Sequence, residues 1–312
     1  MSAVMPPLSR APAFGALLAV MAMWGSNAAV AKLLLPTYGA IPMTWLRWLI
    51  VMLLAAPFAW RERHAVRVVI AEHWKSLIVF ALIGGVPQNI VVFVGLDYSS
   101  AIHLGLLNSA IPVMILLLGT LFFGHRLQGR ELTGVLISAA GVLVIVFQGS
   151  LGALLRLAMQ DGDNIMLAGM ALWAVYTLRL NHRPQRISLA AFMCLIAAIG
   201  LPVTLPLMLR EVALHGLPHP DTAAVLGLFY MSAVPTLLST VLYGYAIARI
   251  GPAQAGVFIH ATPVFACLFA ALLAGEILHP YHAAGFVLVA SGAWISCQRR
   301  APVLSSAPAH PK

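Results

Sequence analysis

Charged residues are scarce in this chain of 312 residues: Asp, Glu, Lys and Arg make up 9% of it, against 61% for hydrophobic residues. A soluble domain carries about 25% charged residues. The low share therefore excludes an ordinary soluble protein, and a mean hydropathy of +0.94 places the chain in a lipid bilayer. Cysteine is equally rare. Cys194, Cys267 and Cys297 lie in apolar segments without a CxxC pair, which excludes a disulfide framework and indicates small packing residues.

The motifs of membrane enzymes are also missing. The sequence has no HExxH, no GxSxG and no pair of intramembrane aspartates. Two histidine pairs, His215/His219 and His279/His282, have the spacing of zinc ligands on a helix, but adjacent glycine and proline residues interrupt such helices. We therefore predict no metal site and no cofactor, and a membrane-embedded enzyme is the weaker alternative.

Long apolar runs are what the chain does have. Ten of them, bounded by proline, glycine or charge, are near the roughly 20 residues that cross a bilayer. They cover 13–35, 41–60, 74–96, 101–122, 131–148, 164–180, 188–209, 222–246, 253–273 and 281–298. The first run could also be a signal peptide that follows Arg10, but it continues to Leu35 and has a counterpart in the second half, so we predict a retained helix.

Lysine and arginine set the predicted orientation. With the N-terminus inside, most of the 18 basic residues fall in cytoplasmic segments, as the positive-inside rule requires. The net charge of +9 is therefore interpreted as membrane topology, and no nucleic-acid partner is expected. We predict a multi-pass protein of a bacterial-type inner membrane, with both termini cytoplasmic.

One stretch of the chain occurs twice. Residues 105–141 match residues 256–292 without a gap at an offset of 151, with 11 of 37 positions identical, including the pairs Pro112/Pro263 and Gly134/Gly285. We predict two units, 1–148 and 149–312. Each holds five spans, an odd number, so the second unit must be inverted in the membrane, as in many secondary transporters. The expected fold is all-α and integral to the membrane, with ten transmembrane helices as two inverted five-helix repeats.

These residues resemble a known family, the EamA-type branch of the drug/metabolite transporter superfamily. The resemblance rests on Trp24-Gly25-Ser26-Asn27, on Leu46-Arg47 after Pro42, and on the pattern Gly124-x-x-Leu127 to Gly134 to Gly141 that is repeated from Gly275. His125 departs from the glutamate that is common there, whereas the second copy has Glu276. Length, Trp24 and Trp173 are most similar to YddG-type amino-acid exporters. The resemblance implies a ten-helix transporter of small metabolites.

Polar residues inside the spans are the candidates for a substrate pathway, since polar groups in a bilayer usually face a cavity or the bundle interior. The eighth span carries a helical stripe of them beside Pro235: Ser232, Thr236, Ser239, Thr240 and Tyr243. We favour a cavity face for this stripe. The alternative is that the hydroxyl groups bond to their own helix backbone.

Further candidates lie beside prolines. Gln88 and Asn89 adjoin Pro87, and they could equally contact substrate or satisfy the carbonyl that the proline frees. Asn108 precedes Pro112 and His260 precedes Pro263, so these two are candidates for symmetry-related central positions. A neutral core histidine is the open alternative for His260. We predict hinges at Pro87, Pro112, Pro235 and Pro263.

Aromatic residues and one arginine complete the candidate set. Trp24 and Asn27 lie one turn apart on the first span, and Trp173 and Tyr176 repeat this spacing on the sixth. Trp24 is about 16 Å into its helix, near the midplane, so it should line a cavity or pack against its repeat partner. Arg47 could hold a substrate carboxylate, although a salt bridge or a lipid phosphate would explain it equally well.

No Asp or Glu lies in the middle of a predicted span. Proton-coupled carriers usually expose an intramembrane carboxylate or histidine. We therefore favour a gradient-driven carrier that works by alternating access, with weak proton coupling through His260 or His103 as the alternative. The predicted cargo is small metabolites, with amino acids favoured over drugs, nucleosides or cationic compounds. The protein is expected to be a monomer or a weak homodimer.

Overall fold

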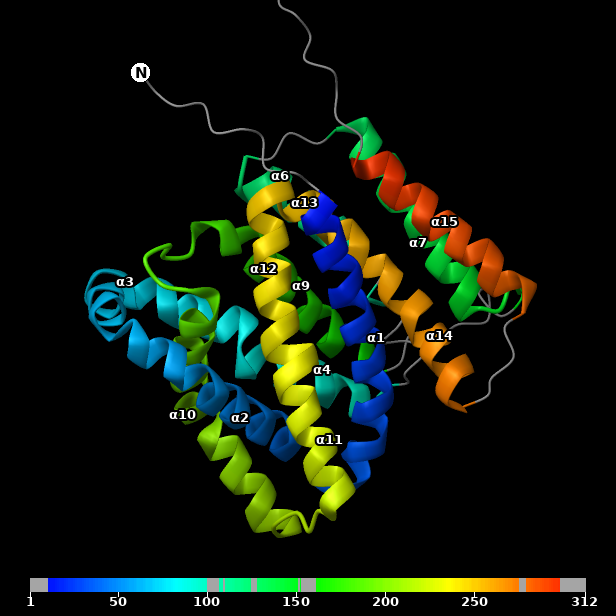
Figure 1. Ribbon diagram of the computed structural model, residues 1–312. Helices are drawn as coiled ribbons and strands as arrows, with labels where there is room; N and C mark the ends of the chain where they lie inside the picture. Colours follow the sequence, from blue (N-terminus) through cyan, green and yellow to red (C-terminus); the bar gives the residue numbers. More distant parts are fainter. Residues whose placement is uncertain are drawn as a thin grey trace, which may run out of the picture.

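The computed structural model describes residues 11–99, 107–108, 110–124, 128–150, 152, 161–274 and 279–297 of the chain (Figure 1). Within these ranges every regular element is helical, which confirms the all-α prediction. The α-helices are α1 (Ala11–Tyr38), α2 (Ala40–Arg61), α3 (Arg63–Gly84), α4 (Val86–Asp97), α6 (Ala110–Phe122), α7 (Gly129–Val146), α9 (Asp163–Arg179), α10 (Leu189–His215), α11 (Thr222–Ser232), α12 (Ser239–Ile250), α13 (Pro252–Val257), α14 (Thr262–Ala274) and α15 (Pro280–Cys297). Among the described residues, six helical segments are long and apolar enough to cross a membrane, and α6 is a shorter apolar helix. The number of ten spans stays a prediction.

The helices follow the apolar runs closely, with one clear difference. The third predicted span starts at residue 74, but α3 begins at Arg63. Two irregular residues delimit the additional segment: Glu62 (φ −97°, ψ 17°) ends α2, and His73 (φ −126°, ψ 18°) kinks α3. Residues 63–72 therefore form a short helix of their own between two apolar segments.

The four candidate hinge prolines all lie at or near irregular backbone or helix starts. Pro87 is in the first turn of α4, directly after the break at Gly85, and Pro112 is in the first turn of α6. Pro263 follows a 3-10 segment, η3 (Phe258–Ala261). Pro235 lies in a π-helical stretch, η2 (Ala233–Leu238). Whether these positions bend during function stays a prediction.

Thr236 explains how the eighth predicted span tolerates its proline. Pro235 has no N–H for the carbonyl of Met231, four residues earlier. The hydroxyl of Thr236 donates to that same carbonyl at 2.6 Å. The π turn and this side chain together let the helical chain continue from α11 through the proline into α12.

Helices α7 and α15 lie side by side and relate the two halves of the chain (Figure 1). A Cβ on Gly134 would lie 2.5 Å from the carbonyl oxygen of Gly292, and one on Gly141 would lie 2.7 Å from that of Gly285. The offset of 151 converts the first contact into the second. The two helices are antiparallel and make the same contact twice, so a pseudo-two-fold axis perpendicular to them relates α7 to α15. The axis passes near Ser138, whose hydroxyl donates to the carbonyl of Val289 at 3.5 Å.

The same pseudo-symmetry governs the centre of the bundle. Helix α1 packs against α12 and α14, and its counterpart α9 packs against α4 and α6. Gly25 allows one of these approaches, since a Cβ there would lie 2.9 Å from the backbone nitrogen of Ala266. The core between them is fully buried and includes Leu17, Met21 and Phe80. Each half therefore packs its first helix against two helices of the other half.

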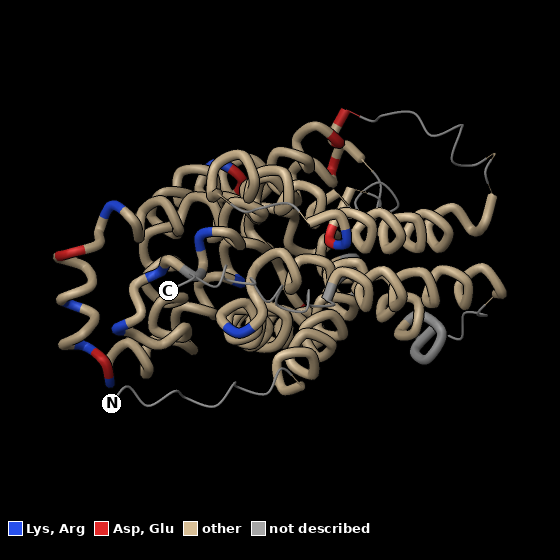
Figure 2. Tube along the Cα trace, turned by 90° about the horizontal axis from the view of Figure 1, so that it is seen from above, with Lys and Arg blue, Asp and Glu red and all other residues tan. Residues whose placement is uncertain are grey.

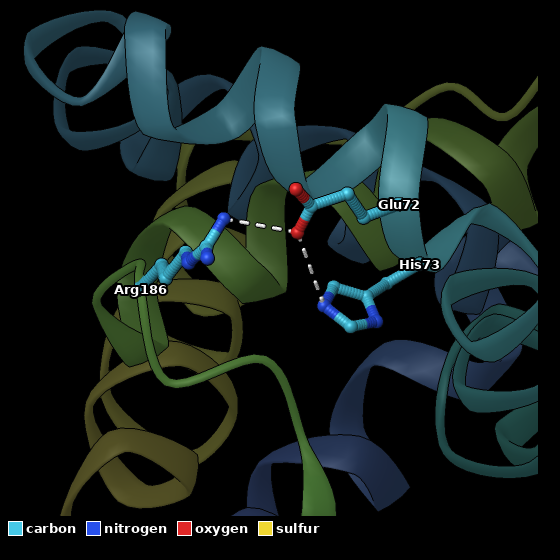
Figure 3. A network of polar contacts seen from close by, with 3 residues as sticks. All are labelled: Glu72, His73 and Arg186. Carbon is cyan, nitrogen blue, oxygen red and sulfur yellow. Dashed lines mark hydrogen bonds and ion pairs between the residues drawn. The ribbon is translucent and has the colours of Figure 1, made fainter.

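Charged residues are confined largely to the ends of helices, and long stretches of helix carry none (Figure 2). Near α3 they connect the two halves. The Arg186 guanidinium, in the segment before α10, lies 2.9 Å from the Glu72 carboxylate, and His73 lies 3.8 Å from the same group (Figure 3). The Glu62 carboxylate accepts the backbone N–H of Ser188 at 2.7 Å. Both carboxylates of this segment are thus engaged with the second half of the chain.

Arg183 stabilises the segment between α9 and α10. Its guanidinium donates to the carbonyls of Pro184 at 3.0 Å and Ile187 at 2.9 Å. Burial lowers the pKa of Arg183, while the nearby Tyr176 and Glu62 raise it. A guanidinium titrates so far above neutral pH that Arg183 stays charged.

Candidate functional site

Four aromatic rings meet where α1, α9 and α12 come together. The ring of Trp24 lies 5.6 Å from that of Trp173, edge to face, and 5.2 Å from that of Tyr243. Trp173 stacks on Tyr176 at 5.1 Å. All four residues were site candidates from the sequence, and Trp24 on the first helix of one half contacts Trp173 on the first helix of the other. We call these four residues the aromatic cluster.

Hydroxyl groups of the eighth predicted span mostly serve their own helix. Ser232 donates to the carbonyl of Leu228 at 2.7 Å, and Ser239 donates to that of Pro235 at 2.6 Å. Together with Thr236, this is the backbone bonding that the sequence left open as the alternative to a cavity face. Ser239 also reaches another helix, because the indole N–H of Trp24 donates to its hydroxyl at 2.9 Å. The stripe therefore both stabilises the π-helical stretch and positions the aromatic cluster.

Buried polar atoms in and next to the cluster lack hydrogen-bond partners, among them those of Tyr176 and Asn27. The hydroxyl of Tyr176 and the side-chain oxygen of Asn27 are buried and make no hydrogen bond within the described part of the chain. Leaving such a group unpaired costs about 1–3 kcal/mol. Gly84 makes room for the Tyr176 ring, since a Cβ there would lie 1.9 Å from a ring carbon. Both polar atoms therefore keep unused capacity for a hydrogen bond.

A second polar group joins α2, α4 and α9. The Arg47 guanidinium donates to the amide oxygen of Asn89 at 2.5 Å. Asn89 donates to the carbonyl of Gly85 at 3.2 Å and to the amide oxygen of Gln88 at 3.0 Å, and Gln88 donates to the carbonyl of Gly169 at 3.0 Å. Asn89 therefore bonds to a carbonyl at the helix break, but Gly85 is not the residue four before Pro87 whose carbonyl the proline frees, so both predicted roles of Asn89 stay predictions. We call Arg47, Gln88 and Asn89 the arginine network.

The two groups are close along α9. Gly169, which receives the bond from Gln88, precedes Trp173 of the aromatic cluster by one helical turn on the same face. The offset of 151 also places Gln88 on Ser239, and each contacts the first helix of the opposite half, α9 and α1 respectively. The polar contacts thus obey the same pseudo-symmetry as the glycines.

Arg47 is a buried cation without a nearby anion. The side chain is 4% exposed, its guanidinium carbon lies 5.6 Å from the Phe93 ring centre, and its Nε has no hydrogen-bond partner. Across the described residues, no carboxylate lies within ion-pair distance of it. The salt bridge that the sequence left open for Arg47 is therefore not seen there. A buried charge in this state is strongly stabilised by an anion that reaches it.

The remaining candidates lie apart from these contacts. Asn108 is helical and half-buried, and His260 is 1% exposed within η3. Neither takes part in the ring contacts of the cluster or in the arginine network as described above. His103 lies outside the described residues. Two contributors were missed from the sequence, Phe80, whose ring meets Tyr176 at 5.9 Å, and Phe93. Nothing distinguishes either from any other apolar residue of an apolar helix.

Comparison with known proteins matches both halves to one family. Residues 12–147 and 161–297 each fit the profile of the EamA-like transporter family. The chain is 27% identical to a probable amino-acid metabolite efflux pump of Salmonella typhimurium, over 93% of this chain and 95% of that protein. It is 26% identical to a probable amino-acid metabolite efflux pump of Escherichia coli, over 89% of this chain and 92% of the relative. A solved structure shares the fold with a TM-score of 0.72 at 18% identity, over 92% of this chain and 97% of the other.

Proposed function

We propose that this chain, which belongs to the EamA-like transporter family, exports small metabolites that carry a carboxylate, with amino acids as the favoured class. The relatives are transporters and efflux pumps, so the prediction of a transporter rather than an enzyme is confirmed. Such a protein works in a lipid bilayer on a small-molecule substrate. The names of the two relatives, probable amino-acid metabolite efflux pumps, support amino-acid metabolites as the substrates of this chain.

Arg47 carries the proposal for the substrate. A guanidinium presents two parallel N–H groups that match a carboxylate. Among the described residues, Arg47 has the neutral amide of Asn89 as its hydrogen-bond partner, and its Nε is unpaired. A substrate carboxylate would supply the missing negative charge in a site where water is scarce.

The aromatic cluster supports the rest of the recognition. Trp24, Trp173 and Tyr243 offer ring faces and edges to an apolar side chain, and the hydroxyl of Tyr176 offers a hydrogen bond. The same rings favour the second candidate, a cationic drug-like compound or a nucleoside, because ring faces also attract cations and stack on bases. Arg47 opposes the cationic compound by charge repulsion.

For the mechanism we propose alternating access by the two inverted units, 1–148 and 149–312. The reciprocal packing of α7 on α15 supports a rigid frame, and the breaks at Pro87 and Pro263 support bending of the helices around the site. The positive-inside rule supports cytoplasmic termini in a bacterial-type inner membrane. Transport down a substrate gradient is favoured, since the buried carboxylates among the described residues, Glu131 and Asp163, lie in the first turns of α7 and α9 and not in the middle of a span.

A flux assay tests the proposed function. The purified protein is reconstituted in proteoliposomes, and exchange of labelled amino acids is compared with that of their carboxamides, nucleosides and cationic compounds. We expect amino acids to cross chemically unchanged and carboxamides to cross at least about tenfold more slowly, the effect of losing one charged hydrogen bond. Equal rates for amino acids and carboxamides would refute the role of the carboxylate. A chemically converted product would indicate an enzyme.

Trp24 provides a graded test of the aromatic cluster. Trp24→Phe keeps a ring in the cluster but removes the N–H that Ser239 accepts. A neutral hydrogen bond contributes about 0.5–1.5 kcal/mol, so transport should fall by roughly twofold to tenfold. Trp24→Ala also removes the contacts with Trp173 and Tyr243 and should have a larger effect. The rates are measured in proteoliposomes at equal protein content, with Trp294→Ala, 71% exposed on α15, as the control. Wild-type transport by Trp24→Ala would contradict a role for the cluster.

A further inference from the structure

An unassigned groove lies where α2, α3 and α10 meet. It has a volume of about 290 Å³, and its floor is formed by Ala56, Ala59, Val66 and Cys194. These residues are small or apolar, and they come from all three helices. No residue that lines the groove belongs to the aromatic cluster or to the arginine network.

Two guanidinium groups stand at the rim of this groove. Arg63 and Arg67 line it, lie one helical turn apart on α3, and are both exposed. Neither has a carboxylate within ion-pair distance among the described residues. The neighbouring carboxylates are engaged elsewhere, Glu62 with the Ser188 backbone and Glu72 with Arg186 (Figure 3). The rim is therefore positively charged and uncompensated.

The segment that carries the rim has the features of a membrane surface. Residues 63–72 connect two apolar segments and are set off from them by the irregular residues Glu62 and His73. Exposed tryptophans flank the segment, with Trp60 72% and Trp74 52% exposed. Exposed tryptophans next to apolar segments are typical of the boundary between hydrocarbon and headgroups. The Arg63 guanidinium lies 5.8 Å from the Trp60 ring, which orients it beside the groove.

We infer that this groove binds an anionic phospholipid of the cytoplasmic leaflet, with the phosphate between Arg63 and Arg67 and an acyl chain along the apolar floor. The groove matches both parts of such a lipid. The two guanidinium groups can bind one phosphate, and the small and apolar residues of the floor can contact an acyl chain. Anionic lipids are concentrated in that leaflet. The inference uses the membrane orientation of the proposed function but not its substrate.

Lipid binding to the purified full-length protein tests this inference. Native mass spectrometry in detergent measures retention of phosphatidylglycerol against phosphatidylcholine. We expect the wild type to favour phosphatidylglycerol, and the double variant Arg63→Gln/Arg67→Gln to bind it about tenfold or more weakly, the effect expected for two cations at an anionic surface. Arg130→Gln, an exposed arginine at the start of α7, is the matched control and should bind like the wild type.

A second variant tests the floor. Ala59→Phe fills the groove without changing charge and should weaken lipid binding while leaving a monodisperse protein. Inorganic phosphate alone should compete poorly, because it cannot use the apolar floor. Wild-type retention of phosphatidylglycerol by the double variant, equal retention of the two lipids, or full competition by inorganic phosphate would each overturn the inference. None of these readouts depends on transport, so a failure here is separate from a failure of the proposed function.

Discussion

Gly292→Leu is expected to abolish the folded bundle. A Cβ at Gly292 would lie 2.5 Å from the carbonyl oxygen of Gly134 and 2.6 Å from the backbone nitrogen of Ser138. Both atoms belong to the backbone of α7, so no side-chain rotation can relieve the clash. Extra methylenes in a well-packed core already cost about 1–3 kcal/mol, and helices in a membrane depend on this close approach of small residues. We expect little or no monodisperse protein after extraction into detergent.

Two further variants separate the effect of the size of the new side chain from the effect of its position. Gly292→Ala should give a folded protein with a lowered melting temperature, because a methyl group forces α7 and α15 apart by less than a leucine side chain does. Gly129→Leu, at the start of α7, introduces the same side chain where nothing lies within 4 Å of a Cβ and should melt like the wild type. Size-exclusion chromatography after stepwise heating measures both. A Gly292→Leu protein with the wild-type melting temperature would contradict the reciprocal packing of α7 and α15.

Much of this frame can be predicted from the sequence. Apolar runs of membrane-spanning length set the helices, because a bilayer requires each backbone polar group to bond within its own segment. The repeat then constrains how the helices pair. Gly134 and Gly285 are equivalent by the offset of 151, and inverted units bring equivalent helices together antiparallel. The sequence does not state that Gly134 faces Gly292; that pairing requires the two-fold axis, which only the structure locates.

The side chains of the site are less predictable, for identifiable reasons. Hydroxyls at helical spacing both line cavities and bond to carbonyls one turn earlier, and the sequence cannot separate the two. In the structure Ser232, Thr236 and Ser239 make the backbone bonds. Residues 63–72 escape a hydropathy search because charged and apolar residues alternate along this helix. Phe80 and Phe93 belong to the site only because the packing of helices that are distant in the sequence places their rings next to Tyr176 and Arg47.

Arg47→Gln is expected to have the largest effect on transport. The glutamine can still bond to Asn89 but has no positive charge for a substrate carboxylate. Removing one partner of a buried, hydrogen-bonded charge pair costs about 2–5 kcal/mol, so exchange of amino acids should fall about 30-fold or more. Exchange of amino-acid carboxamides, which lack the carboxylate, should not fall. Arg47→Lys should be intermediate, since an ammonium keeps the charge but not the planar fork.

Asn89→Asp distinguishes recognition of substrate from a structural role for Arg47. The new carboxylate would occupy the position now 2.5 Å from the guanidinium and would supply within the protein the anion that we assign to the substrate. If Arg47 recognises substrate, Asn89→Asp should raise the melting temperature and inhibit amino-acid exchange together, because the two carboxylates compete for one cation. If Arg47 serves only the fold, the stabilised variant should transport normally. For Arg47→Gln, the control for the loss of one positive charge is Arg210→Gln, at an exposed position near the end of α10. This variant should leave exchange unchanged.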